Sequence, residues 1–357
     1  MNMSNNGKRS VGVKEIARRA NVSIGTVDRV LHNRGGVSEK TKEKIIAVIK
    51  ELNYQPNILA RRLASGRTIH LFTLIPAISD ETDYWDVPLQ GIIQAENEIK
   101  LYDVKVSKFF FDMNDRKSFV ERYQQILQEE QIDGVLLAPA FIEEAIAFTN
   151  VCQQRNIPFV FINSDIPNQK SLCYFGPDLF YSGYSVAHLV RYLTSENDKI
   201  LVMNISKDVA SDHHILRKEE GFRKYFIEKQ ISQTIITKNL TQTDYDSVKA
   251  GLDEVLQQYP DIRLVFVTNS RVSLVAQYFE SKGKGNILLV GYDFITRNIE
   301  YLNKEIIDFL ICEKPQEQAY RGVKALYHYI MFEENIEKDF YMPIDIIHKG
   351  NQKFYRN

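Results

Sequence analysis

A dense group of basic side chains occupies the first 68 residues of the chain. This segment holds fourteen Lys and Arg against five Asp and Glu, a net charge of +9, whereas the whole 357-residue chain carries −1. The remaining residues therefore carry −10. Clustered cations bind phosphate, so this asymmetry favours a nucleic-acid partner for the N-terminal end alone. A solvated helical surface could also be basic, and charge alone leaves both interpretations open.

Three short helices are predicted to position these cations. The first is indicated by an apolar face with i, i+3, i+4 and i+7 spacing, made of Val13, Ile16, Ala17 and Ala20. Ser23 can cap a second helix and Ser38 a third. The outward face of the second helix then carries Gly25, Asp28, Arg29 and His32. Two short helices joined by a tight turn and braced by a third form a helix-turn-helix, whose second helix enters the major groove of DNA.

A further short helix is predicted after Pro56. This proline lacks an N–H group and ends the third helix, and Asn57 can cap a new helix of about two turns. Isolated helices shorter than roughly 12–15 residues are marginal in water. We therefore expect this segment to fold only against a partner.

The sequence of the N-terminal segment resembles the headpiece of the LacI/GalR family of bacterial transcription regulators. The matching runs are Val13 to Leu31, Val37-Ser38, Leu52 to Ala60, and Leu63. The resemblance implies a sequence-specific DNA-binding regulator, and we expect a repressor. It places the DNA contacts at Ser23, Ile24, Gly25, Thr26, Arg29, Asn33, Tyr54, Asn57, Ala60 and Leu63. Asp28 stands where the family usually has serine, which leaves the operator sequence open.

The resemblance assigns distinct tasks to these residues. Ser23 and Thr26 match phosphate-binding positions, whereas Arg29 matches a base-reading position and can form a bidentate contact with guanine. In the family two hinge helices, one per subunit, pair in the minor groove and insert a leucine that Leu63 matches. The resemblance thus implies a homodimer on pseudo-palindromic double-stranded operator DNA, controlled by the separation of its subunits.

From Ile69 onward, apolar strands alternate with amphipathic helices, a pattern typical of an α/β fold with parallel sheets. The predicted strands are Ile69–Pro76, Val104–Phe111, Gly134–Ala138, Pro158–Asn163, Leu172–Phe175, Ile200–Ile205, Leu264–Thr268, Ile287–Tyr292 and Ile306–Cys312. So many strands favour two doubly wound lobes with a ligand at the carboxyl ends of the strands. This part resembles the type I periplasmic-binding-protein-like sensor domain of the same family.

The expected organisation is therefore a small all-α headpiece followed by a two-lobed α/β domain. The headpiece spans 1–56, the hinge helix and linker span 57–68, and the effector-binding and dimerisation domain spans 69–357. We expect lobe one at about 69–176 and 313–341, and lobe two at about 177–312 and 342–357.

The resemblance also implies which residues bind a small-molecule effector, for which we expect a sugar or sugar derivative. They are Tyr84, Trp85, Asn163, Arg217, Asn269, Asp293 and Glu313. The two aromatic residues could instead close the core of the lobe. The family's arginine falls between Arg217 and Lys218, and we favour Arg217. Ser270 follows Asn269 where aspartate is usual, and Glu313 stands where glutamine is usual.

The sequence leaves two alternatives for the function of the domain at 69–357. The effector could be a non-sugar metabolite such as a nucleobase, or the body could only dimerise or sense a partner protein. We take the convergence of four side chains on one cleft as the test that separates a sensor from a dimerisation module. These are Trp85, Asn163, Asn269 and Asp293.

Several classes of protein are not expected. The sequence has no GxSxG motif, no phosphate-binding glycine loop and no metal-ligand spacing, so we expect no enzyme, cofactor or metal. His213-His214 would need further ligands to hold zinc. Cys152, Cys173 and Cys312 are expected as buried thiols. No run approaches the roughly 20 apolar residues that cross a bilayer, so we expect a cytoplasmic protein without a membrane partner.

Overall fold

The computed structural model describes residues 13–31, 35–52, 54, 67–79, 82–209 and 212–357. The chain divides into two compact units, Met1–Gly66 and Arg67–Asn357. Asn33, Asn57, Ala60 and Leu63, four of the expected DNA contacts, lie outside the described residues.

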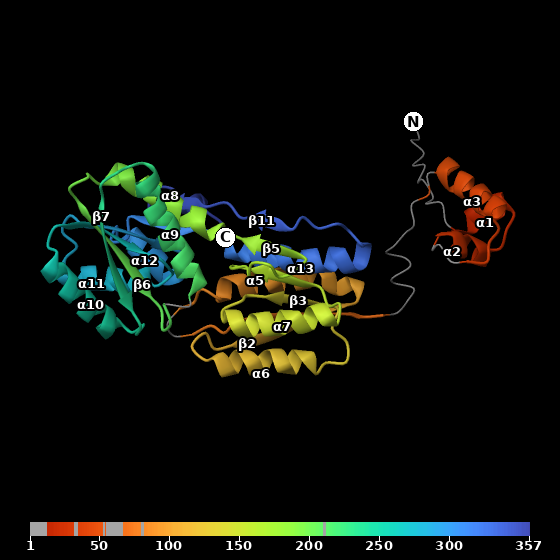
Figure 1. The fold of residues 1–357 in the computed structure, drawn as a ribbon, viewed down its shortest axis with the longest axis horizontal. Helices are drawn as coiled ribbons and strands as arrows, with labels where there is room; N and C mark the ends of the chain where they lie inside the picture. Colours follow the sequence, from red (N-terminus) through yellow and green to blue (C-terminus); the bar gives the residue numbers. More distant parts are fainter. Residues whose placement is uncertain (1–12, 32–34, 53, 55–66, 80–81, 210–211) are drawn as a thin grey trace, which may run out of the picture. The chain divides into compact units, whose positions relative to one another are not determined.

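The first unit contains the three predicted helices (Figure 1): α1 (Val13–Ala20), α2 (Ile24–Leu31) and α3 (Glu39–Glu51). Their small core joins the predicted apolar face of α1 to one buried residue of α2 and two of α3: Ile16, Ala17, Ala20, Val27, Ile45 and Val48. Ser23 accepts a hydrogen bond from the N–H of Thr26 (3.1 Å), and Ser38 accepts one from the N–H of Thr41 (3.4 Å). Both predicted caps are therefore confirmed.

The second unit contains two six-stranded sheets. The first has the order β11-β5-β4-β3-β1-β2, and the second has the order β12-β10-β9-β8-β6-β7. The strands of the first are β1 (Ile69–Pro76), β2 (Val104–Phe111), β3 (Gly134–Leu137), β4 (Phe159–Ile162), β5 (Cys173–Gly176) and β11 (Asp339–Tyr341). Those of the second are β6 (Lys199–Ile205), β7 (Thr234–Leu240), β8 (Ile262–Val267), β9 (Leu288–Tyr292), β10 (Phe309–Cys312) and β12 (Asp345–Ile347). All pairings of these strands are parallel except that of β12 with β10.

Helices cover both faces of each sheet. Figure 1 shows α5 (Asp86–Ile99) and α13 (Pro315–Phe332) on one side of the first sheet, with α6 (Arg116–Leu127) and α7 (Ile142–Gln154) on the other. Around the second sheet lie α8 (Leu179–Leu193), α9 (His213–Glu228), α10 (Tyr245–Gln258), α11 (Val272–Lys282) and α12 (Thr296–Asn303). Successive side chains of a strand point to opposite faces. In β1, Leu71 and Ile75 therefore join one core cluster, whereas Phe72 and Leu74 join the other.

The nine predicted strands all form, and three further strands were not predicted. β7 carries polar residues at an edge of its sheet and is only partly buried, while β11 and β12 have three residues each. β10 begins at Phe309 rather than Ile306, because the N–H groups of Ile306 and Ile307 donate to Tyr301 at the end of α12. The three cysteines are free and buried, as expected. None of the described helices combines the length and apolar character needed to cross a membrane.

Two glycines allow α8 and α9 to pack with their backbones in contact. A Cβ atom at Gly183 would lie 1.8 Å from the carbonyl oxygen of Lys218, and one at Gly221 would lie 1.9 Å from that of Phe180. Real Cβ atoms do not approach backbone oxygens this closely, so any side chain here must push the helices apart. This contact matters for function, because the first turn of α9 lines a cavity in the second unit.

Gly221→Ala should therefore destabilise the second unit by about 1–3 kcal/mol, the usual cost of overpacking a core. We expect thermal unfolding to show a melting temperature several degrees lower. Gly251→Ala in α10 is the matched control, because the nearest atoms to its Cβ would be the movable side-chain ends of Leu240 and Lys238. An equal effect of the two substitutions would contradict the proposed backbone contact.

Candidate functional site

The outward face of α2 carries most of the described residues that were expected to contact DNA. Ser23, Ile24, Gly25 and Arg29 are exposed, and Ile24 keeps 50% of its surface accessible. Thr26 is half-buried, and its hydroxyl lies 2.8 Å from that of Ser23 at the start of the helix. Free N–H groups at a helix start favour an anion such as phosphate. Tyr54, in contrast, is half-buried against the headpiece core.

Other cations of the headpiece are held by acidic side chains. Glu15 binds Arg18 (2.6 Å) and Arg19 (3.0 Å), and Arg19 also binds Glu51 (2.6 Å). The hydrogen bonds from Arg18 and Arg19 lower the pKa of the Glu15 carboxyl to about 2. Arg19 therefore joins α1 to α3, whereas Arg18 pairs within α1.

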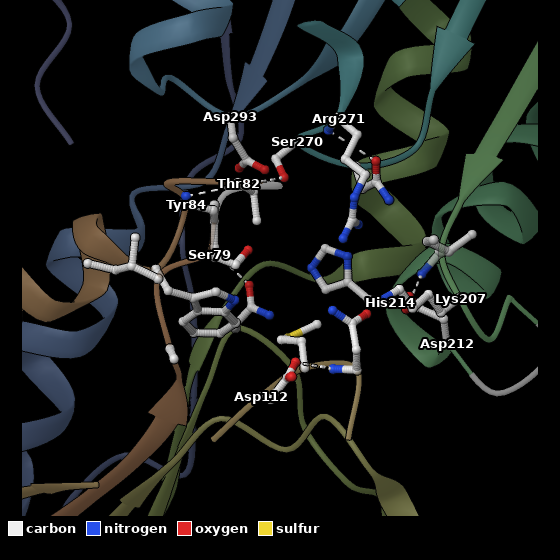
Figure 2. A pocket seen from close by; sticks show the side chains of 18 residues that line it. Ser79, Thr82, Tyr84, Asp112, Lys207, Asp212, His214, Ser270, Arg271 and Asp293 are labelled. Carbon is white, nitrogen blue, oxygen red and sulfur yellow. Dashed lines mark hydrogen bonds between the residues drawn. The ribbon is translucent and has the colours of Figure 1, made fainter. Parts of the chain in front are cut away.

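The second unit contains a cavity of about 520 Å³ between its two lobes. Its lining residues follow the carboxyl ends of β1, β2 and β4 in the first sheet and of β6, β8 and β9 in the second. Five of the seven expected effector residues line it: Tyr84, Trp85, Asn163, Asn269 and Asp293. Figure 2 shows Asp293 and Ser270 on one side, Asp112 on the opposite side, and the imidazole of His214 between them.

Tyr84 and Trp85 belong both to the cavity wall and to the core of the first lobe. They are 8% and 5% exposed, and their rings meet edge to face with centroids 5.0 Å apart. The hydroxyl of Tyr84 donates to the side-chain oxygen of Asn163 (2.8 Å). Packing on the core thus fixes the orientation of both rings at the cavity wall.

Asn163 and Asp293 occupy equivalent positions in the two lobes. Asn163 follows β4 and Asp293 follows β9, and both have positive φ angles, 68° and 74°. The N–H of Asn163 donates to Phe175 (3.2 Å), and that of Asp293 donates to Ile311 (2.9 Å). Such backbone conformations are uncommon outside glycine and often occur at functional sites.

The carboxyl group of Asp293 is buried, and burial raises its pKa to about 7. The nearby cation of Lys218 opposes this shift, whereas the carboxylate of Glu313 adds to it. Asp293 therefore changes between its neutral and charged forms near physiological pH.

Polar groups from β8 complete the lobe-two side of the cavity. The amide nitrogen of Asn269 donates to the carbonyl of Ile205 (2.8 Å), and its oxygen accepts from the N–H of Arg271 (3.2 Å). The hydroxyl of Ser270 lies 3.3 Å from that of Thr82, which belongs to the other lobe. The cavity is thus closed on one side by a hydrogen bond between the lobes.

The start of α9 supplies two titratable groups. Asp212 caps the helix and accepts from Ser206 (2.9 Å), and burial raises its pKa. His214 lines the cavity, and burial followed by the charge of Lys218 lowers its pKa well below the usual value. The imidazole is therefore neutral at pH 7 and can both donate and accept a hydrogen bond.

Two expected effector residues do not reach the cavity wall. Arg217 binds Glu220 (2.5 Å) and lies over the ring of Phe180 (5.2 Å), on the other side of α9. Its neighbour Lys218 is the buried cation, 3.2 Å from Glu313. Glu313 is itself buried in this ion pair. None of Arg217, Lys218 and Glu313 lines the cavity, so the effector contacts expected of Arg217 and Glu313 stay predictions.

Several cavity residues were not expected from the sequence. They are Ala77, Ile78, Ser79, Thr82, Asp112, Met113, Asn114, Lys207, Asp212, His214, Ile215, Ser270 and Arg271. Asp112 to Asn114 follow β2 directly, so the strand-end argument used for Asn163 could have found them. Asp212 and His214 come from the start of a helix and have no such signal.

Comparisons with known families match both parts of the chain. Residues 72–334 match the periplasmic binding protein domain, and residues 12–57 match the bacterial regulatory proteins of the lacI family. The transcriptional regulator RegA of Clostridium saccharobutylicum is 35% identical over 137 residues, which are 38% of this chain and only 39% of RegA. The ribose operon repressor of Halalkalibacterium halodurans is 26% identical over 79% of this chain and 80% of the repressor.

Solved structures agree with this assignment. A protein from Bacteroides fragilis assigned to the LacI transcriptional regulators has a TM-score of 0.75 and 28% identity, covering 81% of this chain and 100% of that chain. GanP, a glucose-galactose binding protein from Geobacillus stearothermophilus, has a TM-score of 0.71 over 80% of this chain and 99% of GanP, and its 19% identity supports the fold alone. The chain therefore belongs to the lacI family of bacterial regulatory proteins, a family of transcriptional regulators rather than of enzymes, and carries a periplasmic-binding-protein-type domain after its helix-turn-helix headpiece.

Proposed function

We propose that this protein is a homodimeric repressor whose affinity for a pseudo-palindromic operator is controlled by a sugar bound in the 520 Å³ cavity. One observation carries the sensor part of the proposal. Trp85, Asn163, Asn269 and Asp293, which come from four separate segments, all line this cavity. A domain that only dimerised would not need polar and aromatic groups converging on a cavity between its lobes.

The lining suits a carbohydrate. Amides, hydroxyls and a carboxylate can bind several ligand hydroxyls, and the rings of Tyr84 and Trp85 can pack on C–H bonds. The ribose operon repressor, which is similar over 79% of this chain, is named for a sugar, and this supports the same class of ligand here.

Control of DNA binding follows from the position of the cavity. Both lobes contribute lining residues, so a ligand changes the relative stability of their open and closed arrangements. In a dimer, a change in the lobes alters the spacing of the two headpieces and hence their fit to two half-sites.

A thermal-shift panel of sugars tests the proposal. We expect at least one monosaccharide to raise the melting temperature, because a ligand that binds the folded state alone stabilises it. Asp293→Ala should abolish this increase, since it removes the carboxyl group that lobe two presents to the cavity directly after β9. Asp246→Ala, on the exposed face of α10, is the matched control and should leave the increase unchanged. Stabilisation by nucleobases and by no sugar would contradict the sugar assignment.

The raised pKa of Asp293 predicts that sugar affinity depends on pH. With a pKa of about 7, the carboxyl is neutral at pH 6 and charged at pH 8, and the charged form accepts more hydrogen bonds. Affinity measured by calorimetry should therefore rise by up to about tenfold from pH 6 to pH 8. Asp293→Asn should remove the dependence. A pH profile that persists in this variant would point to another group.

Base recognition by the headpiece can be tested separately. Arg29→Ala should lose about 1–3 kcal/mol of discrimination at one base pair of each half-site. Lys40→Ala, which removes an exposed cation of α3, should instead weaken binding to all sequences alike. Binding-site selection from randomised duplexes, followed by anisotropy titrations, distinguishes the two. Uniform weakening by Arg29→Ala would show that it binds phosphate only.

A further inference from the structure

A side compartment of about 70 Å³ adjoins the main cavity. The two share the walls formed by Trp85, Met113, Asn163, Asp212 and His214. The residues found only in the side compartment are Ala138, Pro139, Ala140, Ile142, Ser164 and His213. Because a water-sized group takes roughly 30 Å³, the compartment admits a substituent of a few non-hydrogen atoms.

The residues that follow β3 form part of the wall of the side compartment, and they differ in polarity from those at the equivalent place in the other lobe. β3 and β8 occupy equivalent places in the two sheets, beside β1 and β6 respectively. β3 ends at the side compartment, and β8 ends at the main cavity. β8 is followed by the polar run Asn269 to Arg271, whereas β3 is followed by Ala138-Pro139-Ala140. A hydroxyl placed against the alanines and the proline ring would lose its hydrogen bonds with water, so this wall favours an apolar group.

Polar residues also line the side compartment, and two of them have buried atoms without partners. Among the described residues, Nδ1 of His213 and Nε2 of His214 are buried and have no hydrogen-bond partner. The side-chain oxygen of Asn163 already accepts a hydrogen bond from the hydroxyl of Tyr84. Asn163 therefore offers a ligand its N–H₂ group as a donor. Buried polar atoms without partners are rare and costly, so a ligand group that reached these nitrogens would gain by pairing with them.

We propose that the side compartment receives an acylamino group, so that the effector is an N-acylated amino sugar. This inference rests on the proposed function. The acyl methyl group would pack on the wall of Ala138, Pro139 and Ile142, while the amide would bind the N–H₂ group of Asn163 and the imidazole nitrogens. A deoxy sugar would fill the apolar half alone and leave the imidazole nitrogens without partners.

Matched sugar pairs test the inference by calorimetry on the full chain. We would titrate N-acetyl-D-glucosamine against D-glucose, and do the same for the galactose and mannose pairs. At least one acetylated sugar should bind at least tenfold more tightly than its parent. A parent that binds as tightly as its acetylated form would overturn the inference and leave the sugar proposal intact. Binding by neither member of any pair would count against both proposals.

Two variants locate the effect in the compartment. Ala140→Leu fills it without touching the main cavity, and should lower the affinity for the acetylated sugar at least tenfold while changing that for its parent less than twofold. Ala147→Leu, on the exposed side of α7, is the matched control and should change neither.

Ser164→Ala provides a second variant that retains the volume of the compartment. Of the described residues that line the side compartment, Ser164 carries the one hydroxyl group, which would bind the amide of the acylamino group there. Its removal should lower the preference for the acetylated sugar severalfold. A preference that survives both Ala140→Leu and Ser164→Ala would show that the acyl group binds elsewhere.

Discussion

Parallel strand pairing is the constraint on which the rest of this structure depends. A parallel strand must be followed by a crossover on a face of the sheet, so the two faces are taken by helices and the polar loops gather at the strand ends. In both lobes the last backbone hydrogen bonds of the sheet place one polar residue at the cavity. The N–H of Asn163 is held by Phe175 and that of Asp293 by Ile311. The position of the site is therefore set by the same bonds that hold the sheets together.

The residues of the cavity also depend on packing that is not local. Tyr84 and Trp85 could be assigned either to the core or to a ligand from sequence, and they belong to both places. The contact between α8 and α9 at Gly183 and Gly221 fixes α9 against its sheet, and with it the helix start that carries His214. Recognition groups here are thus rigid because they are extensions of the core, which lowers the entropy lost when a ligand binds.

The sequence predicted those features that local patterns encode. Strands with continuous apolar runs, the two serine caps and five cavity residues were correctly placed, because burial and strand ends leave a clear signal. The edge strand β7 was missed, since its polar residues face solvent and resemble a loop. The helix pattern around Arg217 and Lys218 also carried a signal, which concerns the side chain that is buried. Ile215, Lys218 and Phe222 share one helix face, and both apolar residues are buried, so Lys218 had to point inward.

The buried ion pair beneath the cavity indicates what the site requires from a ligand. Lys218 lies 3.2 Å from Glu313 and 3.3 Å from the centre of the Tyr292 ring, while Ser182 holds the other oxygen of Glu313 at 2.5 Å. The charge of Lys218 is thus balanced by Glu313, and its attraction is too weak to offset the burial of Asp293, whose pKa stays raised. An anionic group placed against Asp293 would add repulsion to this desolvation. Neutral hydroxyl donors would instead stabilise the carboxylate, so at this end of the cavity the electrostatics favour a polyol over an acid.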